Sequence, residues 1–341
     1  MTRRERVIET INHKAPSDFI PYQIGFTHQS WEKMAAYYKD ENFDEKIGNH
    51  IKDAYYSGEF TEVKEGYFKD DFGVVWNRTG ADKDIGVIDN IMIPEPDVSI
   101  YTFPAVPEAD LRARCQSVVA GADDCFTTAS LGFSLFERAW TLTGMEDLLV
   151  YMVSEPGFVD ALMDKILEFN LKILDIYLEY DVDCVHFGDD WGQQKGLIMG
   201  PVMWRRFIKP RLAEMYGAVK KTGRFVSQHS CGDIRDVMPD VIDIGLDVYQ
   251  TFQPEIYDIR AIKDAYGDRL TFWGGISTQR LLPFETPEKI IEKAAEIIRI
   301  VGKNGGYIVA PTHAIPGDVP EENIDALIRL CTDQARYIPA Y

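Results

Sequence analysis

The sequence predicts an α/β protein whose chain forms a (β/α)8 TIM barrel. From about residue 124 onward, short β-type runs that end in polar residues or glycine alternate with amphipathic segments of helical periodicity. A long series of this kind forms either an open doubly wound sheet or a closed barrel. No Gly-x-Gly-x-x-Gly turn follows a strand, and no linker rich in Gly, Ser and Pro divides residues 1–341. We therefore expect a barrel and a single domain.

The expected barrel strands number seven. They are residues 18–26, 125–133, 184–192, 224–232, 247–255, 270–278 and 307–315. Helical periodicity is clearest at 156–180 and 286–302, where apolar residues recur every three or four positions. An eighth strand is not evident. Residues 30–123 are polar and rich in loops, with hairpin-like pieces at 70–80 and 84–97, and we interpret them as partly an insertion after the first strand.

Composition narrows the class of protein. Hydrophobic residues make up 45% of the chain, which is enough for a sizeable core. A net charge of -19 disfavours binding to nucleic acid or to an anionic membrane surface. The first residues carry charges, and no later run approaches the ~20 apolar residues that span a bilayer. Five widely spaced cysteines do not suggest a disulfide framework, so we expect reduced thiols and a cytoplasmic protein.

The stretch "QHSCGDI" contains the first candidate site. Residues i and i+2 of a strand share a face, so His229 and Cys231 are expected to project together from the C-terminal end of their strand, where barrels carry their active sites. His313 ends a later strand and completes a three-ligand set typical of catalytic zinc. The alternative is ordinary packing, because cysteine is commonly buried. Core packing is the preferred interpretation for Cys184 and His186.

Other polar residues at strand ends are candidate site residues at the same C-terminal mouth of the barrel. Asp189 and Asp190 are candidate catalytic residues that orient a ligand or transfer a proton, although a solvated or salt-bridged pair is an equal alternative. Glu255 is a candidate fourth metal ligand, with Gln253 as a weaker one. A supporting role beside the metal is as good an interpretation of Glu255.

Aromatic residues at or just past the strand ends are expected to line a substrate pocket, although most aromatics so placed belong to the core. The candidates are Phe26, Phe133, Trp140, Trp191, Phe252 and Trp273.

Several segments together resemble the uroporphyrinogen decarboxylase-like superfamily. They are "DDWGQQKGLIMGPVMWRRFIKPRL", "HSCGD", "GLDVYQTFQP", "WGGIST" and "GGYIVAPTHAIPGDVPEENIDAL", and the resemblance covers roughly residue 125 to the end. Within this superfamily the chain looks like the corrinoid-dependent methyltransferase branch, including the methyltransferase components of O-demethylases. Members of that branch are barrels that hold zinc through a His-x-Cys pair and a later cysteine after "AP". His229 and Cys231 match the pair, whereas His313 replaces the cysteine.

The resemblance implies a zinc-dependent methyltransferase that uses a corrinoid carried by a partner protein. We expect transfer from a small methoxylated donor, of the aryl methyl ether kind, to cobalt(I). The opposite direction, from methylcorrinoid to a thiol, is one alternative. A decarboxylase is a second, but residues 22–30 lack the arginine-bearing segment by which that enzyme holds substrate carboxylates. A non-catalytic barrel that docks a corrinoid protein is a third.

Overall fold

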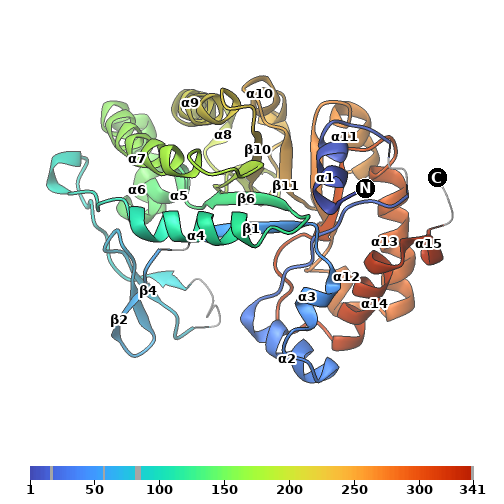
Figure 1. Cartoon of the computed structure of the whole chain (residues 1–341). Coiled ribbons are helices and arrows are strands. Elements are labelled where there is room, and N and C mark those ends of the chain that lie inside the picture. Colours follow the sequence, from blue (N-terminus) through green and yellow to red (C-terminus); the bar gives the residue numbers. More distant parts are fainter. Residues whose placement is uncertain (16–17, 57, 81–85, 339–341) are drawn as a thin grey trace.

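A curled sheet of seven parallel strands forms the centre of the protein. The computed structural model describes residues 1–15, 18–56, 58–80 and 86–338. In spatial order the strands are β1 (Ile51–Tyr56), β6 (Phe126–Leu131), β7 (Cys184–Gly188), β10 (Phe225–His229), β11 (Val248–Phe252), β12 (Thr271–Ile276) and β13 (Tyr307–Pro311). Figure 1 shows part of this sheet, with β1 and β6 near the centre of the view. The predicted α/β barrel is confirmed.

Residues 20–26 lie between β13 and β1. Tyr22 and Phe26 form parallel bridges with Val309 and Ile315, and the amide of His50, next to β1, donates to the Tyr22 carbonyl at 3.1 Å. This segment therefore takes the place of an eighth strand and closes the sheet into a barrel. It is the expected first strand, in an irregular form.

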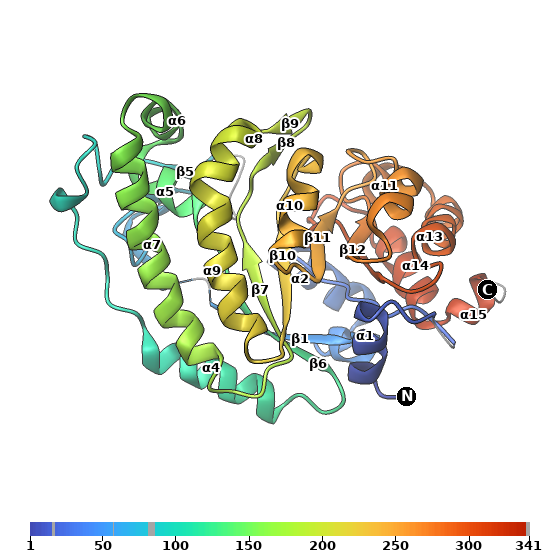
Figure 2. The same cartoon turned by 90° about the horizontal axis from the view of Figure 1, so that it is seen from above.

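Helices surround the sheet, as the view from above shows (Figure 2). The helices that alternate with the strands are α4 (Glu108–Ala120), α7 (Pro156–Tyr177), α9 (Lys209–Lys220), α10 (Met238–Asp243), α11 (Ile259–Tyr266), α13 (Pro287–Val301) and α14 (Glu321–Thr332). The helix α13 begins where expected, because Thr286 caps it through the Lys289 amide and Pro287 occupies the first turn. No helix in the described part of the chain is long and apolar enough to cross a bilayer.

Shorter elements decorate this frame. They are α1 (Arg3–Ile11), α2 (His28–Tyr38), α3 (Phe43–Ile47), η1 (Val98–Ile100), α5 (Phe136–Thr143), α6 (Met145–Ser154), β8 (Gly192–Gln193), β9 (Gly196–Leu197), α8 (Gly200–Met203), the π-helical η2 (Trp204–Ile208), η3 (Arg235–Val237), α12 (Leu281–Phe284) and α15 (Gln334–Tyr337). Helix α1 covers the N-terminal end of the barrel, where Val7 and Ile11 pack on Phe126, Trp273 and Ile308. This apolar layer seals the barrel floor, so ligands have access from the opposite end.

The strand β1 lies within residues 30–123, which were predicted to be partly an insertion after the first strand, and it corrects the place of that insertion. It is a full barrel strand, paired with β6 from Ile51 to Tyr56. Asp53 and Tyr55 face into the barrel on the same side as Ile51, so the strand has no apolar run that would reveal it in the sequence.

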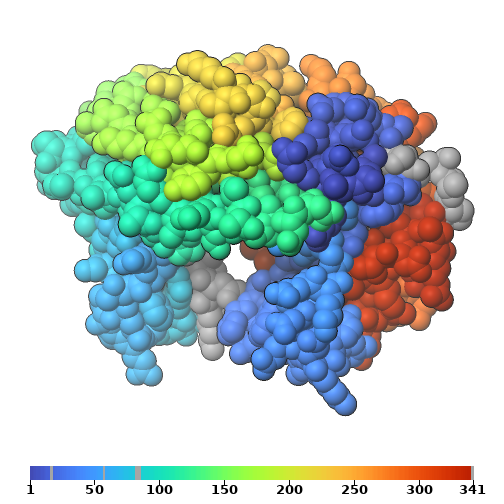
Figure 3. All heavy atoms as spheres, in the orientation of Figure 1, coloured from blue at the N-terminus to red at the C-terminus, as the bar shows by residue number. Residues whose placement is uncertain are grey.

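The true insertion follows β1. It forms a four-stranded antiparallel sheet from β2 (Thr61–Lys64), β3 (Tyr67–Lys69), β4 (Val75–Asn77) and β5 (Val87–Ile88). The hairpin-like pieces contribute β4 and β5, although residues 84–85 of the second piece lie outside the described residues. The molecule is hollowed below α4, between this sheet and α2 and α3 (Figure 3). Both segments follow C-terminal strand ends, so the hollow lies at the mouth side of the barrel.

We expect His50 to make the fold sensitive to acid. Its ring is 1% exposed, and neither ring nitrogen has a hydrogen-bond partner among the described residues. Burial lowers its pKa from 6.5 to about 4. Below pH 6.5 the unfolded chain therefore binds a proton that the folded chain excludes, and stability falls by up to about 3 kcal/mol as the pH drops to 4.

The variant His50→Leu should lose less stability than the wild type between pH 7 and pH 4.5, as measured by urea unfolding at the two values. The exposed His28, replaced by leucine, serves as the control. An unchanged pH dependence in His50→Leu would contradict this assignment.

Candidate metal centre

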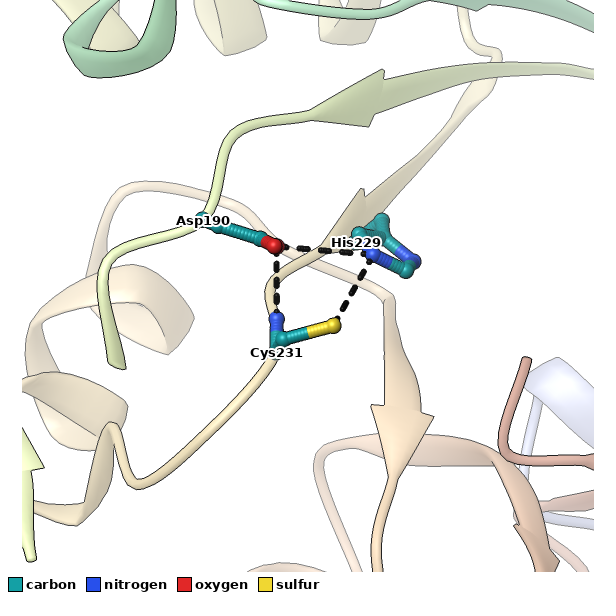
Figure 4. Close-up of side chains that lie close together, drawn as sticks. All are labelled: Asp190, His229 and Cys231. Atoms are coloured by element: carbon teal, nitrogen blue, oxygen red, sulfur yellow. Dashed lines mark hydrogen bonds and ion pairs between the residues drawn. The ribbon is translucent and has the colours of Figure 1, made fainter. Parts of the chain in front are cut away.

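Three side chains meet at the C-terminal ends of the neighbouring strands β7 and β10. One ligand atom each from Asp190, His229 and Cys231 lies within 4.8 Å of the others (Figure 4). His229 Nε2 is 3.4 Å from Asp190 Oδ1 and 3.5 Å from Cys231 Sγ. In the register of the two strands, Gly188 lies opposite His229, and Asp190 and Cys231 each follow two residues later. Imidazole nitrogen, thiolate sulfur and carboxylate oxygen are all donors that bind zinc.

The imidazole of His229 is held in one orientation by Gln250. These residues are partners across β10 and β11, and His229 Nδ1 is hydrogen-bonded to Gln250 Oε1. An amide oxygen only accepts, so Nδ1 carries the proton and the Nε2 lone pair faces Asp190 and Cys231. A partner of this kind is typical of metal-binding histidines.

The loop that carries Cys231 is hydrogen-bonded from several sides. The Cys231 amide donates to Asp190 Oδ1 at 2.7 Å, and the Gly232 amide donates to Gln253 Oε1 at 2.8 Å. The Tyr257 hydroxyl donates to the Gly232 carbonyl at 2.9 Å. The amide oxygen of Gln253 thus accepts from the loop instead of facing the cluster.

The glycine of "HSCGD" has a specific structural role. Gly232 has a φ of +77°, and a Cβ there would lie 2.3 Å from the carbonyl carbon of Gly192. A Cβ on Gly192 would in turn lie 2.6 Å from the Gly232 carbonyl carbon. The loops that carry Asp190 and Cys231 therefore touch backbone to backbone, which only glycine permits at both positions.

The cluster is partly exposed and acidic. Burial raises the pKa of the Cys231 thiol, and Asp190 raises it further. Burial and the neighbouring carboxylates of Asp190 and Asp189 also raise the pKa of Glu137 well above its ordinary value. A divalent cation would compensate these groups, so the chemistry of the site fits a metal. Sequence reasoning missed Glu137, whose one signal was a carboxylate in the first turn of the helix after the 125–133 strand.

Asp189 has a different place from Asp190. It is fully buried, and its carboxylate accepts hydrogen bonds from the amides of Leu135, Phe136 and Glu137 at the start of α5 and from Trp191 Nε1. Burial raises its pKa to about 6 despite these donors. Asp189 therefore anchors α5 to β7, and the prediction that both aspartates reach a ligand is corrected, because adjacent residues of an extended chain point in opposite directions.

His313 and Glu255 lie outside the group of three. The ring of His313, on the loop after β13, is 6.1 Å from the ring of His229, centroid to centroid, and is exposed. Glu255 Oε1 accepts from the Ser277 hydroxyl, while Oε2 is buried and has no hydrogen-bond partner in the described part of the chain. Burial raises the pKa of Glu255. The structure thus brings His313 beside the cluster and ties Glu255 to the loop after β12.

The six candidate aromatic residues are dispersed. Trp191 and Phe252 are fully buried, packed on Trp204 and on Phe272, which corrects the prediction that they line a pocket. Trp273 belongs to the barrel floor. Phe252 and Trp273 lie within β11 and β12, where side chains alternate between the barrel interior and the surrounding helices, so these aromatics do not converge on one rim.

The remaining three aromatics are partly exposed. Phe26 packs on Phe43, with ring centroids 5.3 Å apart, and Trp140 packs on the core from α5. Phe133 lines a side cavity next to Arg138.

The interior wall below the cluster is polar. Asp53 accepts from the hydroxyls of Thr128 at 2.6 Å and Ser130 at 2.7 Å, and desolvation inside the barrel raises its pKa although its side chain remains accessible to solvent. His186 is hydrogen-bonded to Ser227 at 2.9 Å, and burial lowers its pKa to about 3. Asp53 was missed because its strand was missed, whereas His186 has the structural partner expected of an interior histidine.

Fold and site together define a (β/α)8-barrel protein with a group of polar side chains at the C-terminal mouth that could hold a metal ion. The model of the uroporphyrinogen decarboxylase (URO-D) family matches residues 129–334, so the chain belongs to this family of enzymes. This confirms the superfamily predicted from the sequence motifs.

Two similar proteins put this membership in context. A uroporphyrinogen decarboxylase of Psychromonas ingrahamii is 23% identical over 261 residues, which cover 69% of this chain. The match spans 65% of the length of that relative. A methyltransferase from Methanosarcina mazei has a similar structure, with a TM-score of 0.72 and 16% identity over 98% of this chain and 99% of the other. At 16% identity, the similarity to the methyltransferase shows that the two proteins share a fold and no more than that.

Proposed function

We propose that the protein is a zinc-dependent methyltransferase, which moves a methyl group from a small methoxylated compound, of the aryl methyl ether kind, to a cobalt(I) corrinoid on a partner protein. The observation that carries this proposal is the convergence of Asp190, His229 and Cys231 at the barrel mouth, with His229 oriented by Gln250. The similarity of the whole fold to a methyltransferase supports it.

The chain's own residues would hold the metal and position the donor. We infer that His229, Cys231 and Asp190 bind zinc and that His313 lies on its open side. When bound, zinc would supply a Lewis acid that binds the ether oxygen and stabilises the charge of the departing alkoxide or phenoxide. The sealed floor leaves the mouth as the route by which both the donor and the corrinoid partner arrive.

The direction of transfer is inferred from the type of donor atoms. His313 stands where the related methyltransferases carry a second cysteine, and the second anionic donor of this cluster is the Asp190 carboxylate. A carboxylate oxygen is a harder donor than a thiolate sulfur and gives less electron density to a metal, which favours cleavage of an ether over activation of a thiol. Methyl transfer from the corrinoid to a thiol is therefore the less favoured alternative.

Decarboxylation is the second candidate, because the family and the relative from Psychromonas ingrahamii carry that name. Residues 22–30, which close the barrel beside β1, contain no arginine. A substrate with several carboxylates would lack those counter-charges there. Metal content separates the two functions, since the decarboxylase needs no metal.

The test is to purify the protein, measure its metals by elemental analysis, and then add chemically reduced cobalamin with a panel of methoxylated aromatics, methylamines and methanol. Methylcobalamin is followed by its absorbance. We expect about one zinc per chain and methylation from an aryl methyl ether. Methylation from amines or methanol alone would refute the substrate class. Transfer from methylcobalamin to a thiol, with no methylation of cobalamin by any donor, would reverse the direction.

The hydrogen bond from His229 to Gln250 predicts a graded effect on metal binding. Gln250→Leu removes the acceptor and should lower zinc affinity by about 10- to 100-fold. Gln250→Glu keeps an oxygen acceptor and should restore most of it. Competition with a chromophoric chelator measures the affinities, and equal affinities in the wild type and Gln250→Leu would show that the bond does not support the site.

A further inference from the structure

A cavity of about 190 Å³ lies between the four-stranded sheet and the rim of the barrel. Tyr55 and Gly132, at the ends of β1 and β6, border it on the barrel side. Phe72 and Trp76 come from the four-stranded sheet and its loops, and Arg138 comes from α5. The metal-binding side chains do not line this cavity, which makes it a separate feature of the mouth.

The charged residues of the cavity wall are Arg138, Arg78, Asp70 and Asp71, and the largely buried cation among them is Arg138. Its side chain is 13% exposed, and its guanidinium lies over the ring of Phe72 at 3.7 Å and near that of Phe133 at 5.3 Å. Within the described part of the chain its one hydrogen-bond acceptor is Asp70 Oδ2, which receives Nη1 at 3.3 Å. A guanidinium has five N–H donors, so most of the N–H groups of Arg138 make no hydrogen bond within the described part of the protein.

Asp70 does not neutralise Arg138 fully. Its carboxylate also accepts from the amides of Phe72 and Val74, each at 2.9 Å, and from Trp76 Nε1 at 3.1 Å. These three donors already stabilise the negative charge, so the ion pair with Arg138 is long and single instead of bidentate. Burial lowers the pKa of Arg138, in keeping with a guanidinium that has lost water and gained one weak acceptor.

The size and the walls of the cavity suit a planar ring. A cavity of about 150 Å³ lined by apolar side chains binds benzene in a well-studied engineered protein. Here Phe72, Trp76, Phe133 and Phe169 supply aromatic walls, and Arg138 supplies N–H donors that match the two oxygens of a carboxylate. We propose that this cavity binds a single-ring aromatic carboxylate, with Arg138 as its counter-ion.

The cavity also lies close to the metal centre. Leu131 is paired with Phe187, so Gly132 lies beside Gly188, two residues before Asp190. With ~4.8 Å between strands and ~3.3 Å per residue, the backbone of Gly132 is roughly 8 Å from that of Asp190. A methoxylated benzoate held by Arg138 can therefore direct its ether toward the cluster. This last step rests on the proposed function, whereas binding of the ring and carboxylate does not.

The experiment measures binding to protein freed of metal with a chelator. Benzoate, benzyl alcohol and acetate are titrated by calorimetry, since the second keeps the ring without the charge and the third keeps the charge without the ring. We expect benzoate to bind at least 10-fold more tightly than either. Arg138→Gln should lower the affinity for benzoate by about 10- to 100-fold, as expected for loss of a hydrogen bond to a charged group. The affinity of Arg138→Lys should lie between those of the wild type and Arg138→Gln.

Two further variants separate loss of binding from misfolding of the Arg138 variants. Ile173→Phe places a ring in the cavity and should abolish binding while Arg138 is intact. Arg205→Gln removes an exposed arginine that is paired with Asp240 and should leave binding unchanged. Failure of benzoate to bind the wild type, equal binding of benzyl alcohol, or unchanged binding in both Arg138→Gln and Ile173→Phe would overturn the proposal.

The results of the binding experiment and of the methyl-transfer assay distinguish failure of the cavity proposal from failure of the proposed function. Benzoate bound to metal-free protein, with no methyl transfer from any methoxybenzoate after zinc is added, would support the cavity and count against the proposed function. Methyl transfer from an aryl ether, with no benzoate binding and full activity in Ile173→Phe, would support the function and overturn the cavity as its binding site.

Discussion

Replacement of His229 with alanine is expected to reduce bound zinc from about one ion per chain to none under conditions that saturate the wild type. The variant loses the one imidazole whose Nε2 faces both Asp190 and Cys231. We expect more than a 100-fold loss of zinc affinity, because loss of a partner that merely orients a ligand already costs about 10- to 100-fold. Cys231→Ser should behave in the same way.

The fold should survive this change. His229 ends a strand and is 20% exposed, away from the apolar floor of the barrel, so the free energy of unfolding of the metal-free protein should change by about 1 kcal/mol or less. The matched control is His186→Asn, which alters an interior histidine on the adjacent strand that is hydrogen-bonded to Ser227 and not to the cluster. Its zinc content should stay near one.

The same assay tests His313. His313→Ala should keep one zinc but lower its affinity, by about 10- to 100-fold, since three donors remain in the cluster. Elemental analysis and chelator competition distinguish these results. A His229→Ala protein that holds zinc as the wild type does would show that zinc binds at another place in the protein.

Replacement of Gly232 with alanine is the second change from which we expect a large effect. A left-handed backbone costs an alanine about 1–2 kcal/mol in any surroundings. At Gly232 the added Cβ would also lie 2.3 Å from the backbone of Gly192, so the loops of Asp190 and Cys231 must move apart. We expect about 3 kcal/mol or more of lost stability, together with loss of zinc binding.

Gly223 is the matched control for this prediction. Its φ of +76° equals that of Gly232 within a degree, but a Cβ there meets nothing within 4 Å. Gly223→Ala should therefore lose only the 1–2 kcal/mol of backbone strain and keep its zinc. Urea unfolding and elemental analysis of both variants provide the comparison. Equal losses of stability, with zinc retained in both, would show that the contact between the loops is unimportant.

The β10 segment shows what strand periodicity can predict. His229 and Cys231 are two residues apart in a run that ends in glycine, and parity alone placed them on one face at the barrel mouth. The structure brings their donor atoms within 3.5 Å of each other. Local pattern was sufficient here because the alternation of β10 continues for two residues beyond its last residue, His229, to Cys231.

The neighbouring strand shows where periodicity stops. Asp189 and Asp190 come just after β7 and point in opposite directions, but the sequence does not say which of the two faces the mouth. Only the packed structure assigns Asp189 to the amides of α5 and Asp190 to the group with His229 and Cys231. Burial energetics make this choice, because a buried carboxylate needs donors and α5 offers unpaired amides at its start.

The sequence by itself determined the α/β barrel, the family and the His-x-Cys pair, because these depend on periodicity and on residues close together in the chain. Tertiary structure alone decided the rest. Strand β1, Asp190 as the third member of the cluster, the burial of Trp191 and the cavity at Arg138 each require contacts between different elements of the fold. Such contacts depend on how whole elements pack, and no local pattern contains that information.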